Sequence, residues 1–171
     1  MTTKFLHARS VISQFIRPLG LACFFVSASA CAEPTSLPGA SATERAVMDA
    51  DIAFNRMAQD VGVPEAFLAY MDETDGKLFR PGDIVTGSEG VAADFETWPD
   101  NARLVWAPLG AHGSASGDLG VTWGEYDVLM DGNQVSSGHY VTAWRKNSDG
   151  EWKGVIDLGV EAPPAPAPAS E

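Results

Sequence analysis

Hydrophobic and polar residues alternate along the last third of the chain, between Leu104 and Leu158. Aromatic and β-branched residues are concentrated there in four segments: LVWAPLGAH, DLGVTWGEYDVLM, QVSSGHYVTAWRK and EWKGVIDLG. The breaks between them, GSASG, DGN and NSDG, consist of residues that favour turns. This arrangement is typical of strands joined by hairpins. The pattern therefore predicts an antiparallel sheet that curls around whatever the protein holds.

A helical periodicity precedes this sheet. Ser41 and Glu44 have the spacing of a capping box, in which each side chain binds the backbone N–H of the other residue. The helix is expected to continue to about Val61 and to end at Gly62. Its apolar residues form one stripe at helical spacing, and Asp51 lies at the edge of that stripe. The stripe contains Val47, Ala50, Phe54, Met57, Ala58 and Val61.

Shorter elements are predicted between residues 63 and 99. Pro64 suits the first turn of a second helix, which would bury Phe67, Tyr70 and Met71. Two short strands, at residues 78–79 and 84–85, flank a turn. Ser88 opens a third helix and Pro99 closes it. The apolar residues of that helix are Val91, Phe95 and Trp98.

One face of the second extended segment is made of small residues. Leu119, Val121 and Trp123 alternate there with Gly120, Thr122 and Gly124. A strand face of Gly, Thr and Gly has few side-chain atoms to pack with. Either another element approaches this face closely, or the face borders a cavity.

The amino terminus has the composition of a secretory signal peptide. Lys4, Arg9 and Arg17 precede the short apolar stretch at residues 19–26, and small residues follow it. The apolar stretch is shorter than the about 20 residues that a membrane-spanning helix needs. We therefore expect residues 1–30 to be a signal peptide that directs the protein to the periplasmic side of a bacterial envelope.

The sequence allows two alternative sites at which the signal peptide would be cleaved. Residues 28–30 resemble a bacterial lipobox, which would make Cys31 the first, lipid-bearing residue of the mature protein. Cleavage after Ala32 would instead leave a soluble periplasmic or secreted protein. We favour the first, so the only expected membrane association is a lipid anchor at Cys31. Residues 31–40 would then be a flexible linker, and the Pro/Ala-rich residues 161–171 a disordered tail.

Charge and cysteine content exclude several classes of function. The formal net charge is −12, and loss of the three basic residues within residues 1–30 would make it −15. Such an acidic protein repels phosphate backbones, so no nucleic acid is expected as a partner. Cys23 and Cys31 are the only cysteines, and Cys23 lies inside the predicted signal peptide. The mature chain therefore cannot form an intramolecular disulfide or a thiolate metal site.

The order of these features resembles the SnoaL-like, or nuclear transport factor 2-like, superfamily. The resemblance is carried by EAFLAYMD, LFRPGDIVTGSEGV, LVWAPLGAHGSASGDLGVTWGEY and GHYVTAWRKNSDGEWKGVIDLG, and it covers residues 43–159. It is closest to the bacterial branch catalogued as a domain of unknown function. It implies an α+β, cone-shaped domain at residues 41–160, with three helices packed on a strongly curved, mostly antiparallel sheet that encloses a pocket. Members include ketosteroid isomerases, limonene epoxide hydrolase, polyketide cyclases and non-catalytic association domains, so the fold alone does not fix the function.

Four residues are candidates for acid/base chemistry in such a pocket: Asp118, His139, Tyr140 and Asp157. An isomerase, hydratase or cyclase needs a carboxylate with a raised pKa in an apolar pocket, and a donor for the developing oxyanion. Each candidate also has a structural interpretation. Asp118 suits a turn hydrogen bond, His139 and Tyr140 suit structural roles, and Asp157 points either to solvent or into the pocket.

Six residues are candidates for contacts with a ligand: Asp51, Phe54, Trp106, Thr122, Trp123 and Trp144. Indole and phenyl rings would line a site for a small apolar or aromatic molecule, although a sheet also needs such rings for packing. No nucleophile elbow, phosphate loop, or zinc or haem spacing is present, so we expect no cofactor and no metal. The sequence therefore predicts a ligand-binding domain, with an acid/base enzyme or a dimerising association domain as alternatives.

Overall fold

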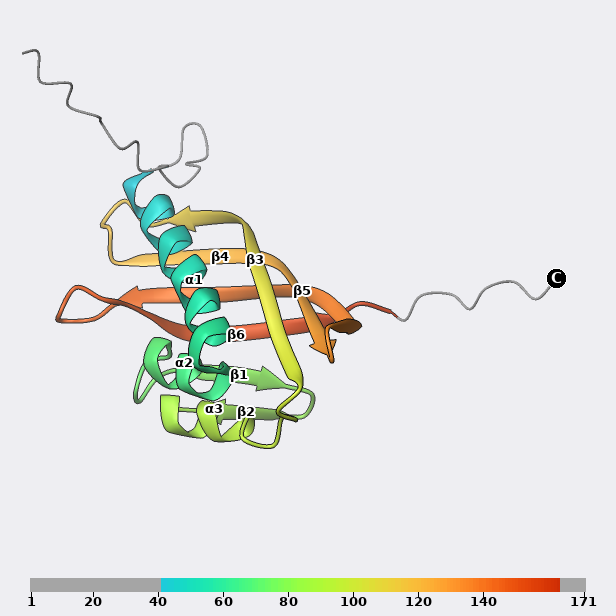
Figure 1. The fold of residues 1–171 in the computed structure, drawn as a ribbon. Helices are drawn as coiled ribbons and strands as arrows, with labels where there is room; N and C mark the ends of the chain where they lie inside the picture. Colours follow the sequence, from blue (N-terminus) through green and yellow to red (C-terminus); the bar gives the residue numbers. More distant parts are fainter. Residues whose placement is uncertain (1–40, 164–171) are drawn as a thin grey trace, which may run out of the picture. The chain divides into compact units, whose positions relative to one another are not determined.

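The computed structural model describes residues 41–163 (Figure 1). Within this range three helices pack against one six-stranded sheet, so the predicted α+β class is confirmed. The predicted signal peptide, Cys31, the linker at residues 31–40 and the tail beyond residue 163 lie outside the described residues. No helix within residues 41–163 is both long enough and apolar enough to cross a membrane.

The first helix, α1, spans Ala42–Val61. The predicted capping box is present, because the Glu44 N–H donates to Ser41 Oγ at 3.1 Å and the Ser41 N–H donates to Glu44 Oε2 at 2.6 Å. The apolar stripe is buried at Val47, Phe54 and Ala58. Val61, in the last turn, is 54 % exposed, so the buried stripe ends one turn earlier than predicted.

Two short helices follow, α2 (Val63–Tyr70) and α3 (Ser88–Asp94). Both begin as predicted, but α3 ends before Phe95 and Trp98. The chain continues from Asp94 in tight turns, in which the Phe95 and Trp98 N–H groups each bond a carbonyl three residues earlier. Phe95 is still buried, and its ring lies 4.5 Å from the ring of Phe67 on α2.

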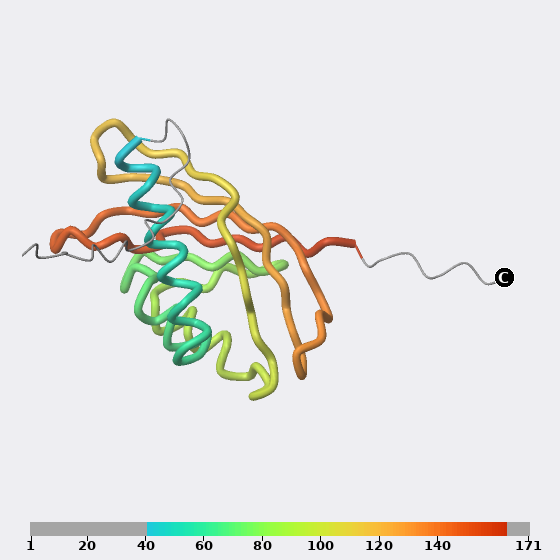
Figure 2. Tube along the Cα trace, turned by 45° about the horizontal axis from the view of Figure 1, so that its top comes forward, coloured from blue at the N-terminus to red at the C-terminus, as the bar shows by residue number. Residues whose placement is uncertain are grey.

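The sheet has the order β2-β1-β6-β5-β4-β3. Its strands are β1 (Lys77–Arg80), β2 (Asp83–Thr86), β3 (Ala102–Gly113), β4 (Leu119–Met130), β5 (Asn133–Lys146) and β6 (Trp152–Glu161). All neighbours are antiparallel except β1 and β6, which run parallel. Strand β6 continues through Glu161, one residue past the predicted end of the domain. The long strands bend around α1, which crosses one face of the sheet (Figure 2).

The small-residue face of β4 lies against α1. A Cβ atom at Gly120 would be 2.6 Å from Val47 Cγ1, so the helix approaches the strand too closely for any larger residue. Thr122 is fully buried, and its Oγ1 accepts a hydrogen bond of 2.9 Å from Trp144 Nε1. Of the two interpretations of this face, close approach is therefore correct at Gly120, and the cavity lies elsewhere.

Candidate ligand-binding pocket

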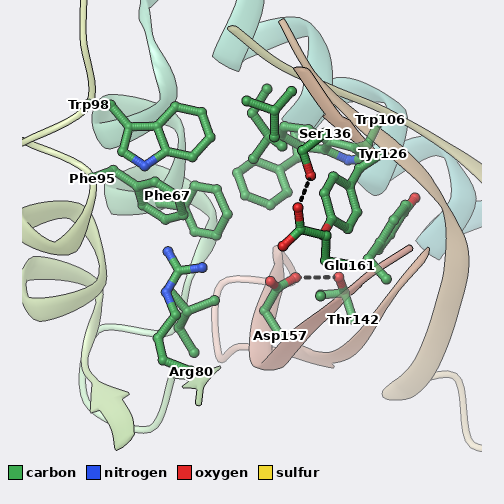
Figure 3. Close-up of a pocket in the computed structure, with 16 residues that line it drawn as sticks. Phe67, Arg80, Phe95, Trp98, Trp106, Tyr126, Ser136, Thr142, Asp157 and Glu161 are labelled. Atoms are coloured by element: carbon green, nitrogen blue, oxygen red, sulfur yellow. Dashed lines mark hydrogen bonds between the residues drawn. The ribbon is translucent and has the colours of Figure 1, made fainter. Parts of the chain in front are cut away.

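A cavity of about 210 Å³ lies between the helices and the inner face of the sheet (Figure 3). Helices α1 and α2, the turns that follow α3, and five strands contribute to its wall. Seven of its sixteen lining residues are aromatic: Phe54, Phe67, Phe95, Trp98, Trp106, Tyr126 and Tyr140. Three more are aliphatic: Leu78, Leu104 and Val128. Two larger hollows, of about 410 and 600 Å³, are more open, and polar side chains make up a larger share of their lining residues. The smaller cavity therefore has the composition of a site for an organic molecule.

Asp157 on β6 brings a carboxyl group into this apolar cavity. Its Oδ2 accepts a hydrogen bond of 2.6 Å from Thr142 Oγ1 on the neighbouring strand β5. Burial raises the pKa of Asp157 to about 6, against the lowering effect of the Thr142 bond. The charge of Asp51 raises this pKa further, and the charge of Arg80 lowers it. Asp157 is therefore a carboxyl group that changes its charge near neutral pH.

A second carboxyl group, Asp51 on α1, lies behind the cavity wall with 0 % exposure. It accepts a hydrogen bond of 2.7 Å from Trp106 Nε1 and one of 2.9 Å from the Tyr140 hydroxyl. Burial raises the pKa of Asp51, while hydrogen bonds from Thr122, Trp106 and Tyr140 oppose that rise. Burial and the charge of Asp51 also raise the pKa of Tyr140. Asp51 thus fixes two aromatic rings that face the cavity.

Two further charged side chains line the cavity, Arg80 and Glu161. The Arg80 guanidinium pairs with Asp94, with Nη2 2.6 Å from Oδ2, and lies 4.8 Å from the centre of the Phe95 ring. Glu161 accepts a hydrogen bond of 2.6 Å from Ser136 Oγ. Figure 3 shows Arg80, Asp157 and Glu161 pointing into the same space. The cavity therefore combines aromatic walls with one base and two acids.

The structure brings four of the predicted site residues to the cavity wall: Phe54, Trp106, Tyr140 and Asp157. Asp51 contacts two of them from behind. Thr122 and Trp144 bond each other in the core beside α1 and do not line the cavity.

Three predicted site residues lie away from the cavity. Asp118 is exposed in the turn before β4, where hydrogen bonds from Ser116 and Ser114 lower its pKa. His139 has a side chain that is 72 % exposed and lies 3.8 Å from Glu125. Trp123 projects from the opposite face of the sheet, because it alternates with the buried Thr122. These three positions do not meet the cavity that Asp157 faces.

Sequence reasoning did not include Arg80, Thr142, Tyr126 and Glu161 among the site residues. A signal existed for Tyr126, since it continues the same alternation as Thr122 and Gly124 on β4. Thr142 likewise follows Tyr140 at the strand period. No local signal marked Arg80 or Glu161, because their place depends on how β1 and β6 pair. Within residues 41–163, no group of three or more His, Cys, Asp or Glu side chains is placed to hold a metal ion.

Solved structures share this architecture. A ketosteroid isomerase-like protein from Erwinia carotovora atroseptica is 16 % identical and superposes with a TM-score of 0.59, over 73 % of this chain and 100 % of that one. A nuclear transport factor 2-like protein of unknown function from Shewanella oneidensis is 16 % identical, with a TM-score of 0.54 over 65 % and 96 % of the two chains. The fold is therefore that of the nuclear transport factor 2-like proteins.

A third structure of this fold contains a ligand. It is a protein from Mycobacterium tuberculosis in complex with estradiol-17β-hemisuccinate, 23 % identical, with a TM-score of 0.51 over 68 % of this chain and 92 % of that one. At such identities the comparison establishes the fold alone. No protein-family model matches the chain, and no curated protein is similar to it in sequence.

Proposed function

We propose that the domain binds a small, mostly apolar organic molecule in the aromatic cavity, with a polar group of the ligand directed at Asp157. The observation that carries this proposal is the cavity of about 210 Å³ in which seven aromatic rings line the wall and the Asp157 carboxyl group faces inward. Rings of this kind give a large apolar contact area, and a single polar group fixes the orientation of the ligand. The steroid complex of a protein with the same fold supports the proposal.

The test uses a pocket-filling variant and a matched control. Gly159 lines the cavity, and a Cβ atom there would lie 3.4 Å from Tyr126 Cε1, so Gly159→Leu adds bulk inside the cavity without a clash at Cβ. Val160 is the next residue and points to the other face of the sheet, where it is 60 % exposed, so Val160→Leu is the control.

The probe is tert-butylbenzene. Its binding is measured from changes in the chemical shifts of the tryptophan indole N–H groups. We expect saturable binding to the wild type, a loss of at least about tenfold in affinity for Gly159→Leu, and no change for Val160→Leu. Equal binding by all three proteins would contradict the proposed site.

Proton transfer at Asp157 is a second candidate function, because its pKa of about 6 suits a general base near neutral pH. Such a base would take a proton from the carbon beside a carbonyl group and return it to another carbon of the same substrate. The oxyanion formed needs a donor. Tyr140 and Thr142 already donate to Asp51 and Asp157, whereas the Tyr126 hydroxyl makes no hydrogen bond within residues 41–163. Tyr126 is therefore the candidate donor.

Isomerisation of a β,γ-unsaturated ketone tests this second candidate. Turnover by the wild type should be abolished in Asp157→Asn and reduced in Tyr126→Phe, with kcat affected more than KM. A wild type that binds the ketone without converting it would leave ligand binding as the function.

We also propose that the outer face of the sheet pairs with a second copy of the domain. Exposed apolar side chains lie there on adjacent strands: Trp123, Ile156, Leu158 and Val160. The register aligns Trp123 with Val141 and Val141 with Leu158, so these side chains form a continuous patch. Light scattering during size-exclusion chromatography should give the mass of a dimer for the wild type and of a monomer for Leu158→Lys. A monomeric wild type would contradict the proposal.

Export with a lipid anchor at Cys31 is proposed on the basis of the amino-terminal sequence. The mass of the protein purified from bacterial membranes should equal that of a chain starting at Cys31 plus acyl chains. Cys31→Ala should release the protein from the membrane fraction. A wild-type mass that begins after Ala32, without acylation, would contradict the anchor.

A further inference from the structure

The charges that line the cavity are not balanced by one another. Asp157 and Glu161 bring two carboxylates to the cavity, and their bonded partners are the hydroxyl groups of Thr142 and Ser136. Among residues 41–163 neither carboxylate forms an ion pair with a lysine or an arginine. Arg80 is the only basic residue in the described cavity lining.

Arg80 is itself neutralised from outside the cavity. Its Nε donates to Asp94 Oδ2 at 2.8 Å, and its Nη2 lies 2.6 Å from the same oxygen. Asp94 does not line the cavity, so its charge offsets that of Arg80 without contacting a ligand. Three acids, Asp157, Glu161 and Asp94, and one base, Arg80, therefore give a net charge of −2 around an apolar space.

The aromatic walls, like the two carboxylates, favour a positively charged ligand. The face of each ring carries partial negative charge and attracts cations, most strongly when the contact is desolvated. Phe95 already contacts the Arg80 guanidinium in this way, 4.8 Å from its ring centre. The formal net charge of the whole chain, −12, adds a field that attracts cations and repels anions.

We infer that the ligand of this cavity is an organic cation, such as an aryl or alkyl amine or a quaternary ammonium compound, whose positive group lies between Asp157 and Glu161. This inference rests on the proposed binding function and specifies the class of the ligand. A quaternary ammonium group presents an apolar surface to the aromatic rings. It also supplies the positive charge that would pair with the two carboxylates.

The experiment compares two molecules of the same shape, phenyltrimethylammonium and tert-butylbenzene, which differ in having a charged nitrogen or a neutral carbon at the quaternary centre. Affinities are measured on the purified protein by the shifts of the tryptophan indole N–H groups. We expect the cation to bind at least about tenfold more tightly, a ratio that corresponds to about 1.4 kcal/mol. The preference should decrease with added salt.

Three variants assign the preference to the cavity. Asp157→Asn with Glu161→Gln should abolish the preference for the cation while tert-butylbenzene still binds. Asp94→Asn should also weaken binding of the cation, because it leaves the charge of Arg80 uncompensated. The control, Glu125→Gln with Asp127→Asn, changes the net charge equally but lies outside this cavity, so it should keep the preference.

Each outcome separates the ligand class from the proposed binding function. Equal or weaker binding of the cation, with tert-butylbenzene still sensitive to Gly159→Leu, would overturn the ligand class and keep the binding function. A preference that the control removes as strongly as the cavity variant would also overturn the ligand class, because it would come from net charge. Failure of both molecules to bind would overturn both proposals.

Discussion

Replacing Asp157 with Asn is expected to stabilise the folded domain at neutral pH. In the folded state the pKa of Asp157 is about 6, compared with an ordinary value of 3.8, and burial is the main cause. At pH 7.5 the folded protein therefore holds a charge in a position that disfavours the charged form more than water does. Asparagine has a similar shape, carries no charge, and has an oxygen that can still accept the hydrogen bond from Thr142.

The magnitude follows from the difference between the two pKa values. A difference of about two pKa units, at about 1.36 kcal/mol for each, corresponds to about 3 kcal/mol. That is an upper value, because Asp157 is only half-buried and its carboxyl group faces an open cavity. It is still a large fraction of the 5–15 kcal/mol that is typical for the stability of a whole domain.

The sign of the pH dependence is fixed by the direction of the shift. Because the folded state binds the proton of Asp157 more tightly than the unfolded state, this residue destabilises the fold progressively as the pH rises from about 3.8 to about 6. The advantage of Asp157→Asn should therefore be absent near pH 3.5, grow across that window and be constant above pH 7. The other charged and polar groups around Asp157 are the same in both proteins, so subtracting the wild-type curve removes their contribution to first order. These groups are Arg80, Asp51, Thr142, Glu161, Tyr126 and Tyr140.

Urea denaturation between pH 3.5 and 8, followed by tryptophan fluorescence, measures the free energy of unfolding. Asp118→Asn is the matched control, because Asp118 is exposed and its pKa is lowered, so it should give no stabilisation at neutral pH. If Asp157→Asn were no more stable than the wild type at pH 7.5, or if its advantage did not depend on pH, the account of Asp157 as a desolvated acid would be wrong.

Two further predictions concern the packing of α1. Asp51→Ala should reduce the free energy of unfolding by about 2–4 kcal/mol, because Trp106 Nε1 and the Tyr140 hydroxyl lose their buried acceptor; Asp49→Ala, on the exposed side of the same helix, is the control. A loss no larger than that of the control would show that the buried bonds contribute little. Gly120→Ala should cost about 1–3 kcal/mol through the clash with Val47, and Val47→Ala in the same chain should recover part of that loss. Strictly additive effects in urea denaturation would contradict the close approach.

The local features of the fold could be predicted from the sequence because they depend on neighbouring residues. The capping box needs only Ser41 and Glu44, three residues apart, and both of its hydrogen bonds are present. The four strands of the last third follow from alternation and turn residues, and so does the small-residue face at Gly120 and Thr122. The sequence did not say whether that face meets a helix or a cavity, since both need small residues.

The candidate site, by contrast, depends on contacts between distant segments. Asp51 meets Trp106 and Tyr140, which lie 55 and 89 residues further along the chain. Alternation alone could not decide between solvent and pocket for Asp157. The parallel register of β1 and β6 decided the orientation of Asp157, because Asp157 lies opposite Leu78, which lines the cavity. The same register brings Arg80, two residues after Leu78, to that cavity.

The sequence by itself therefore determined which segments are helices and strands and which of their faces are small, apolar or charged. Only the tertiary structure decided which acids share an aromatic cavity and which face water, separating Asp157 from Asp118 and His139. The physical reason is range: backbone propensity and alternation act over a few residues, whereas desolvation and charge pairing depend on every segment that packs around a group.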